Sequence, residues 1–102
     1  MFIHSVYFWE REGLTAAERA EWEAGLRSLL GIETVRGGWL GTPAATDRPV
    51  IDRSYSYALL VRFADAHGHD VYQEHPVHDV FRERCARFWK KVLIYDVTTL
   101  DR

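Results

Sequence analysis

The fold of this chain is decided by residues 2–9, which read Phe2-Ile3-His4-Ser5-Val6-Tyr7-Phe8-Trp9. The segment is rich in aromatic and β-branched side chains, which predicts a β-strand. Successive side chains of a strand point to opposite faces, so the even-numbered residues share one face and the odd-numbered residues share the other. Because both faces are largely apolar, we expect both to be covered in the folded protein.

The next segment predicts a helix over residues 16–30. Thr15 is a suitable N-cap, and Glu18 stands three residues further on, which completes a capping box. Gly31 is a suitable C-terminal stop. Between these ends, apolar residues recur at helical spacing and define a buried stripe, namely Trp22, Leu26, Leu29 and Leu30.

The rest of the chain predicts more strands and two shorter helices. Glycines interrupt the first of these strands, which predicts an irregular pairing there, and a polar loop should follow over 43–54. Pro76 should separate the two helices, because the residue before a proline avoids the helical conformation. The predicted strands cover 34–42, 55–63 and 88–97, and the predicted helices cover 65–74, with Asp65 as N-cap, and about 77–85.

This order of elements predicts an α+β fold with the ferredoxin-like β-α-β-β-α-β arrangement and a four-stranded antiparallel sheet. The length of 102 residues favours a single domain over residues 1–102. Two helical segments can cover only one face of such a sheet, and the other face carries Tyr7, Trp9 and Leu60. Soluble monomers rarely expose a contiguous apolar patch of more than a few hundred Å², so we predict a homodimer formed by packing sheet against sheet.

Charge and cysteine content limit the partners of this protein. The formal net charge is −2, from 13 Lys+Arg and 15 Asp+Glu, and no block of like charge occurs. Nucleic acid is therefore not an expected partner, because neutralising its phosphates needs a basic surface, and a membrane surface is not expected either. Cys85 is the single cysteine, which fits a reducing compartment, so we expect a cytoplasmic protein.

Four segments resemble the stress-responsive A/B barrel family, also called the dimeric α/β barrel or Dabb family. The most specific of them is the Tyr-x-x-His-Pro-x-His block over residues 72–78. The others are Ile3-His4, Ser54-Tyr55-Ser56-Tyr57-Ala58-Leu59 and Phe88-Trp89. The resemblance implies a ferredoxin-like protomer and a dimer whose two sheets face each other as a barrel, but it does not fix a function.

One branch of this family is similar to polyketide cyclases, which close a poly-β-keto chain without metal or cofactor. The resemblance to that branch implies that His4, Tyr72 and His78 line a pocket, with His78 as the base and Tyr72 orienting or polarising the substrate. We further expect the substrate to contact Phe8, Tyr57, His75 and Trp89. The branch has a histidine where this chain has Tyr57, and a tyrosine where it has Leu26, so the substrate is not carried over.

The residues themselves support this chemistry and also allow structural roles. A neutral histidine can take a proton near physiological pH, and abstraction of a proton next to a carbonyl needs such a base and a hydrogen-bond donor. His4 could equally be a core histidine bonded to a carbonyl group. His75 could mark a helix-breaking corner with Pro76, and the lone thiol of Cys85 is typical of a small buried side chain.

Metal binding is a second interpretation of the histidines. His67-Gly68-His69 and His75-x-x-His78 resemble ligand pairs, but no cysteine pair or His-Glu-x-x-His motif accompanies them. The sequence therefore assigns no metal ligands and no cofactor. The function it favours is a cofactor-independent lyase, cyclase or isomerase acting on a small keto or aromatic compound. The alternative is a non-catalytic stress-response or small-ligand-binding dimer.

Overall fold

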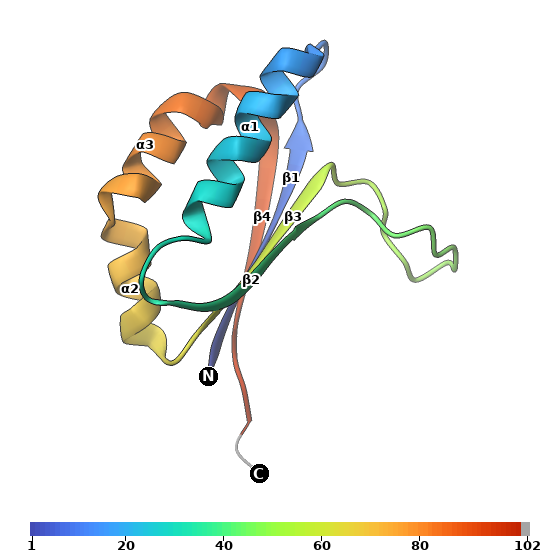
Figure 1. Ribbon diagram of the computed structural model, residues 1–102. Helices are drawn as coiled ribbons and strands as arrows, with labels where there is room; N and C mark the ends of the chain where they lie inside the picture. Colours follow the sequence, from blue (N-terminus) through green and yellow to red (C-terminus); the bar gives the residue numbers. More distant parts are fainter. Residues whose placement is uncertain (101–102) are drawn as a thin grey trace.

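A four-stranded antiparallel sheet forms one layer of the computed structural model, which describes residues 1–100. The strands lie in the order β2-β3-β1-β4, and the helices pack on one face of the sheet (Figure 1). This arrangement confirms the predicted ferredoxin-like fold. The elements are β1 (Phe2–Glu10), α1 (Ala16–Leu29), β2 (Val35–Gly41), β3 (Tyr57–Phe63), α2 (Ala66–Glu74), α3 (Pro76–Cys85), the 3₁₀ turn η1 (Ala86–Phe88) and β4 (Trp89–Thr98).

Helix α1 begins at the predicted capping box. The Thr15 hydroxyl accepts a hydrogen bond from the Glu18 amide at 3.1 Å, and the Glu18 carboxylate accepts one from the Thr15 amide at 3.0 Å. The end of the helix differs from the prediction, because Gly31 does not adopt the left-handed conformation. Instead, the Gly31 amide donates to the Ser28 carbonyl at 3.2 Å, so a tight turn satisfies the last carbonyl groups.

Pro76 divides the second helical segment, as predicted. His75, which precedes it, is extended with ψ 141°, so α2 ends at Glu74. The same residue caps the next helix, because Nδ1 of His75 accepts a hydrogen bond from the Val77 amide at 3.1 Å. Helix α3 therefore begins at Pro76, one residue earlier than expected, with the proline in the first turn, where its missing N–H is not needed.

The strands differ from their predicted limits by one or two residues. The pairing of β2 with β3 shifts register between Val35 and Gly37, which confirms the predicted irregularity. Strand β3 begins at Tyr57 instead of residue 55, and the Ser56 amide reaches the Phe8 carbonyl at 2.7 Å. The first strand extends to Glu10, and the last strand is shifted by one residue relative to 88–97.

The two faces of the sheet have different environments. The face toward the helices holds the core, in which Trp22, Leu26, Val61, Phe63 and Phe88 are fully buried. The opposite face, which we call the open face, has no helix over it in Figure 1. Its side chains are partly or largely exposed and include Ile3, Tyr7, Trp9, Trp39, Leu60, Leu93, Tyr95 and Val97. No helix within residues 1–100 is long and apolar enough to cross a membrane.

The close approach of α1 and α3 at Gly25 yields a stability prediction. A Cβ at this position would lie 2.7 Å from Sγ of Cys85 and 3.2 Å from Cδ1 of Phe81. Alanine normally stabilises a helix by roughly 1 kcal/mol over glycine, but overpacking costs about 1–3 kcal/mol. We expect Gly25→Ala to lower the free energy of unfolding in urea by about 1 kcal/mol.

Two controls separate packing from helix propensity. In a Cys85→Ala background, the obstructing sulfur is gone, so Gly25→Ala should be neutral or stabilising there. Gly31→Ala should be tolerated, because its Cβ would meet only the Ser28 carbonyl at 3.5 Å. If Gly25→Ala stabilises the otherwise unchanged protein, the described packing of α1 on α3 is incorrect.

Candidate functional site

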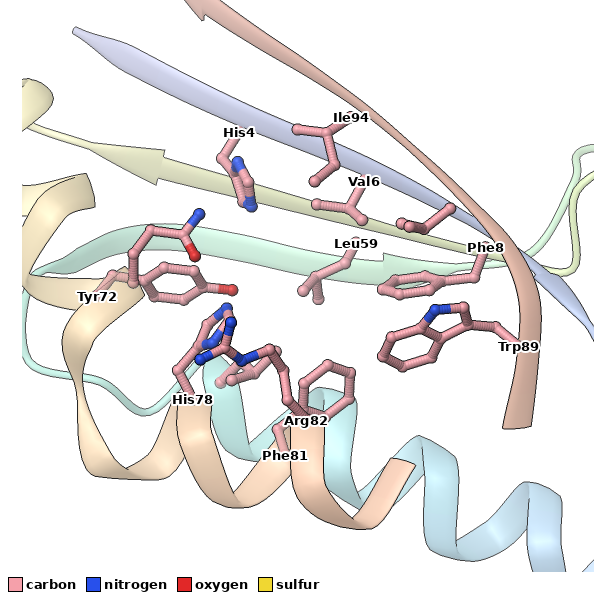
Figure 2. A pocket seen from close by; sticks show the side chains of 13 residues that line it. His4, Val6, Phe8, Leu59, Tyr72, His78, Phe81, Arg82, Trp89 and Ile94 are labelled. Atoms are coloured by element: carbon pink, nitrogen blue, oxygen red, sulfur yellow. The ribbon is translucent and has the colours of Figure 1, made fainter. Parts of the chain in front are cut away.

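A cavity of about 210 Å³ lies between the sheet and α3. Its walls are mostly apolar, and Figure 2 shows Val6, Phe8, Leu59, Phe81, Trp89 and Ile94 around it. The polar side chains that reach it are His4, Tyr72, Gln73, His78 and Arg82. Engineered cavities of about 150 Å³ bind benzene, so this volume suits a compound with one ring. Val92 and Ile94 line the cavity and are exposed, so its β4 side is open to solvent.

Three elements bring the predicted catalytic residues to this cavity. The alternation of β1 directs His4 toward the helices, α2 carries Tyr72, and α3 carries His78. The ring centroids of Tyr72 and His78 are 5.2 Å apart, and those of His4 and Tyr72 are 5.7 Å apart. Tyr72 and His78 lie on different helices, so the corner at Pro76 determines that they face the same space (Figure 2).

Burial sets the protonation states of His78 and Tyr72. Burial, with a smaller contribution from the Arg82 charge, lowers the pKa of His78 to about 4. Its Nδ1 is buried and has no hydrogen-bond partner within the described residues. Burial raises the pKa of Tyr72 well above its ordinary range. Near neutral pH the pocket therefore holds an uncharged imidazole next to a protonated phenol, which are a proton acceptor and a proton donor.

His4 is paired with Asp96, a partner that sequence reasoning missed. Nδ1 of His4 lies 2.6 Å from Oδ1 of Asp96, and His4 is only 3% exposed. An ionised carboxylate can only accept hydrogen bonds, so Nδ1 carries the proton and Nε2 is the nitrogen left for a ligand. The two residues are directly opposite in the pairing of β1 with β4. An antiparallel alignment of the first predicted strand with the last one would have placed Asp96 opposite His4 and so revealed this pair.

The predicted substrate-binding residues separate into two groups. Phe8 and Trp89 line the cavity with ring centroids 4.9 Å apart. Tyr57 lies outside it, where its hydroxyl donates to Glu23 at 2.5 Å and its ring packs on Trp22. His75 also lies outside, where it caps α3 and its Nε2 is 3.2 Å from a carboxylate oxygen of Glu33.

A further histidine, His69, lies beside the paired residues. Its ring centroid is 4.6 Å from that of His4, and ligand-type atoms of His4, His69 and Asp96 all lie within 4.8 Å of one another. Among residues 1–100 this is the one group of three or more such side chains. The pairs suggested by sequence spacing, His67 with His69 and His75 with His78, do not form such a group in the described structure.

The fold and the pocket define a class of protein, a small ferredoxin-like α+β domain with a ligand-sized cavity between its sheet and helices. The chain belongs to the stress responsive A/B barrel domain (Dabb) family, whose pattern matches residues 2–99. This finding confirms the resemblance seen in the sequence. No curated protein matches the sequence significantly.

Solved structures from several organisms share the fold. A Dabb family protein from Mesorhizobium loti is 24% identical, with a TM-score of 0.78 over 98% of this chain and 97% of that one. A dimeric ferredoxin-like protein of unknown function from Thermobifida fusca is 17% identical, with a TM-score of 0.77 over 96% and 90%. Hydroxynitrile lyase from Passiflora edulis is 15% identical, with a TM-score of 0.80 over 99% and 94%. At these identities the likeness shows the fold alone.

The lowered pKa of His78 predicts how stability depends on pH. The folded protein has a pKa of about 4 here, against about 6.5 for an unperturbed histidine. Between these values the unfolded chain binds a proton that the folded protein does not, so the free energy of unfolding should decrease as the pH falls from about 6.5 toward about 4. Urea unfolding at a series of pH values would measure this.

Two further measurements isolate His78. In NMR titrations, its ring signals should shift with a midpoint near 4. The variant His78→Asn should show a weaker dependence of stability on pH, with a remainder from His69, whose pKa burial also lowers. A midpoint for His78 at or above the value for free histidine would show that the ring is not buried as described.

Proposed function

We propose that this protein is a cofactor-independent lyase, cyclase or isomerase that acts on a small keto or aromatic compound by proton transfer. The observation that carries the proposal is the pairing of an uncharged His78 with a protonated Tyr72 at one apolar cavity, which His4 also lines. Perturbed titratable groups that converge in a cleft are typical of active sites. The cavity volume of about 210 Å³ limits the substrate to about one ring.

The reaction begins with removal of a proton next to a carbonyl group. His78 accepts the proton, the electrons of the C–H bond form an enolate, and the Tyr72 hydroxyl donates a hydrogen bond to the enolate oxygen. Return of the proton at another carbon gives isomerisation. Attack of the enolate on a second carbonyl, whose oxygen then takes the proton back from His78, gives cyclisation. The same proton acceptor supports a lyase reaction. It takes the proton of a hydroxyl group, the oxygen electrons form a carbonyl, and the electrons of the breaking carbon–carbon bond leave on a carbanion that takes the proton back.

His4 provides a second proton-handling group in this proposal. The Asp96 carboxylate holds the proton on Nδ1, which orients the ring, and would stabilise the imidazolium that forms when Nε2 takes a proton. Asp96 acts through His4 and is a positioning residue. Phe8 and Trp89 supply flat apolar contacts for a ring, whereas Tyr57 and His75 do not line this cavity.

A lyase with this fold makes the proposed reaction class compatible with the fold, without naming the substrate. The hydroxynitrile lyase from Passiflora edulis shares this fold, and cleavage of a hydroxynitrile is a proton-coupled breaking of a carbon–carbon bond. The alternative function is a non-catalytic stress-response or small-ligand-binding dimer. It is favoured by the size of the open face, because a dimer that covers this face would be stable whether or not the cavity binds a substrate.

We also infer that the protein is a homodimer in which two open faces pack together. Trp39 is 61% exposed and Tyr95 is 57% exposed on this face, an unusual position for large aromatic side chains in a monomer. The related protein from Thermobifida fusca is dimeric. The cytoplasm is the compartment we propose, on the basis of the single cysteine.

Exchange of the protons next to the carbonyl group of a simple ketone for deuterium from the solvent tests the catalytic proposal. Phenylacetone has one ring and exchangeable protons next to its carbonyl group, and NMR in D₂O follows the exchange. We expect the protein to accelerate this exchange and His78→Asn to reduce the acceleration by about 100-fold, the usual contribution of a positioned base. Tyr72→Phe should also reduce it, because the enolate loses its hydrogen-bond donor.

The control is His67→Asn, which changes an exposed histidine outside the cavity and should leave the exchange rate unchanged. Retention of the full rate in His78→Asn would reject His78 as the base. If His4→Asn and Asp96→Asn then lose the rate, the base is His4 instead. Binding of the ketone without any exchange would favour the alternative, a ligand-binding dimer.

Sedimentation tests the dimer. The protein should sediment at roughly twice the protomer mass of 11.9 kDa. Leu93→Glu places a charge in the open face and should shift the equilibrium toward the monomer, since a buried unpaired charge is costly. Val80→Glu is the matched control, because Val80 is a similarly exposed apolar residue on α3 and should not affect assembly. A single monomeric species at working concentrations would contradict the proposed interface.

A further inference from the structure

The cluster of His4, His69 and Asp96 at one end of the cavity has a chemistry that proton transfer by His78 and Tyr72 does not use. The three side chains come from β1, α2 and β4, and their ligand-type atoms lie within 4.8 Å of one another. We propose that this cluster binds one divalent transition-metal ion of the zinc type, with the two imidazoles and the carboxylate as ligands. The proposal goes beyond the proposed function: neither His78 nor Tyr72 is a ligand, and His4 and Asp96 would be ligands in place of their role in proton transfer.

The types of ligand decide which ion the cluster would take. Neutral imidazole suits zinc, copper, iron and nickel, and a carboxylate adds one negative charge. Calcium and magnesium prefer oxygen ligands throughout, so a site with two histidines does not suit them. Two histidines with one carboxylate is the ligand set of known zinc sites that keep a position open for water or substrate. His4 lines the cavity, so the ion would lie at the cavity wall.

The geometry needs only a small adjustment to accept an ion. Zinc–ligand bonds of about 2.0–2.2 Å place neighbouring ligand atoms of a tetrahedral site roughly 3.3–3.5 Å apart. The separation of Nδ1 of His4 from Oδ1 of Asp96 is 2.6 Å, and the other pairs lie within 4.8 Å. Each distance therefore changes by roughly 1.5 Å or less, with the ion replacing the proton between His4 and Asp96. Asp96 is exposed and can make this movement.

The surroundings hold the His69 ring in place beside His4. Phe2 stacks on it with centroids 4.5 Å apart and planes inclined by 22°, and Phe63 meets it edge-on at 5.5 Å. The side-chain amide of Gln73 lies 3.0 Å from Nε2 of His69. Together these contacts restrict the orientation of the His69 ring.

Zinc titration of the purified full-length protein tests the site without any substrate. After chelator treatment and dialysis, calorimetry with zinc chloride should show one ion bound per protomer. Cobalt(II) used as a spectroscopic probe should develop the strong visible absorption of a low-coordinate site. His69→Gln and Asp96→Asn should each weaken zinc binding by at least about tenfold, since the first removes an imidazole ligand and the second removes the negative charge of the carboxylate ligand.

The matched control is His67→Gln, which removes an exposed histidine two residues from His69 on the same helix. Because residues two apart do not share a helix face, this variant should bind zinc as the unchanged protein does. His69→Phe keeps an aromatic ring between Phe2 and Phe63, so it tests the ligand role if His69→Gln does not fold. Absence of zinc uptake, or equal affinity in a folded His69 variant, would overturn the proposal. Zinc titration is measured without the ketone, so its outcome tests the metal site and leaves the proposed function to be tested by ketone exchange.

Discussion

The position of β1 between β3 and β4 is the constraint on which the rest of the structure depends. As a central strand, β1 pairs on both sides, and its alternation sends His4, Val6 and Phe8 toward the helices. A shift of register by one residue would turn all three to the open face and would remove His4 from the cavity. The apolar side chains that fix this register for the core therefore also fix the position of the polar group at the site.

Burial in a small apolar cavity gives the polar groups their chemical character. An imidazole in water is partly charged near neutral pH, whereas His78 is held uncharged by burial and by the nearby Arg82. Nδ1 of His78 has no hydrogen-bond partner among residues 1–100, so it is free to accept a proton or a hydrogen bond from a ligand. His4 differs from His78, because its buried ring has a hydrogen-bond partner in the carboxylate of Asp96.

The edge position of β4 connects the cavity, the cluster of His4, His69 and Asp96, and the open face. β4 has a neighbour on one side only, and residues on both of its faces are exposed, among them Val92, Ile94 and Tyr95. Its helix-facing residues line the cavity and supply Asp96, while Leu93 and Tyr95 belong to the open face. A dimer that covers the open face would thus contact the back of the same strand that borders the cavity, so assembly and ligand access share one element.

Local sequence patterns determined most of the fold. The capping box at Thr15, the aromatic and β-branched strands and the break at Pro76 depend on neighbouring residues, and short-range sterics and hydrogen bonds decide them. The sequence also identified His4, Tyr72 and His78 as a group through a family resemblance. Only the tertiary structure showed that Asp96 and His69 lie beside His4, and that Tyr57 and His75 lie outside the cavity. The physical reason is that strand pairing and helix packing join residues that are far apart in the sequence, 92 positions for His4 and Asp96, a relation that no local pattern records.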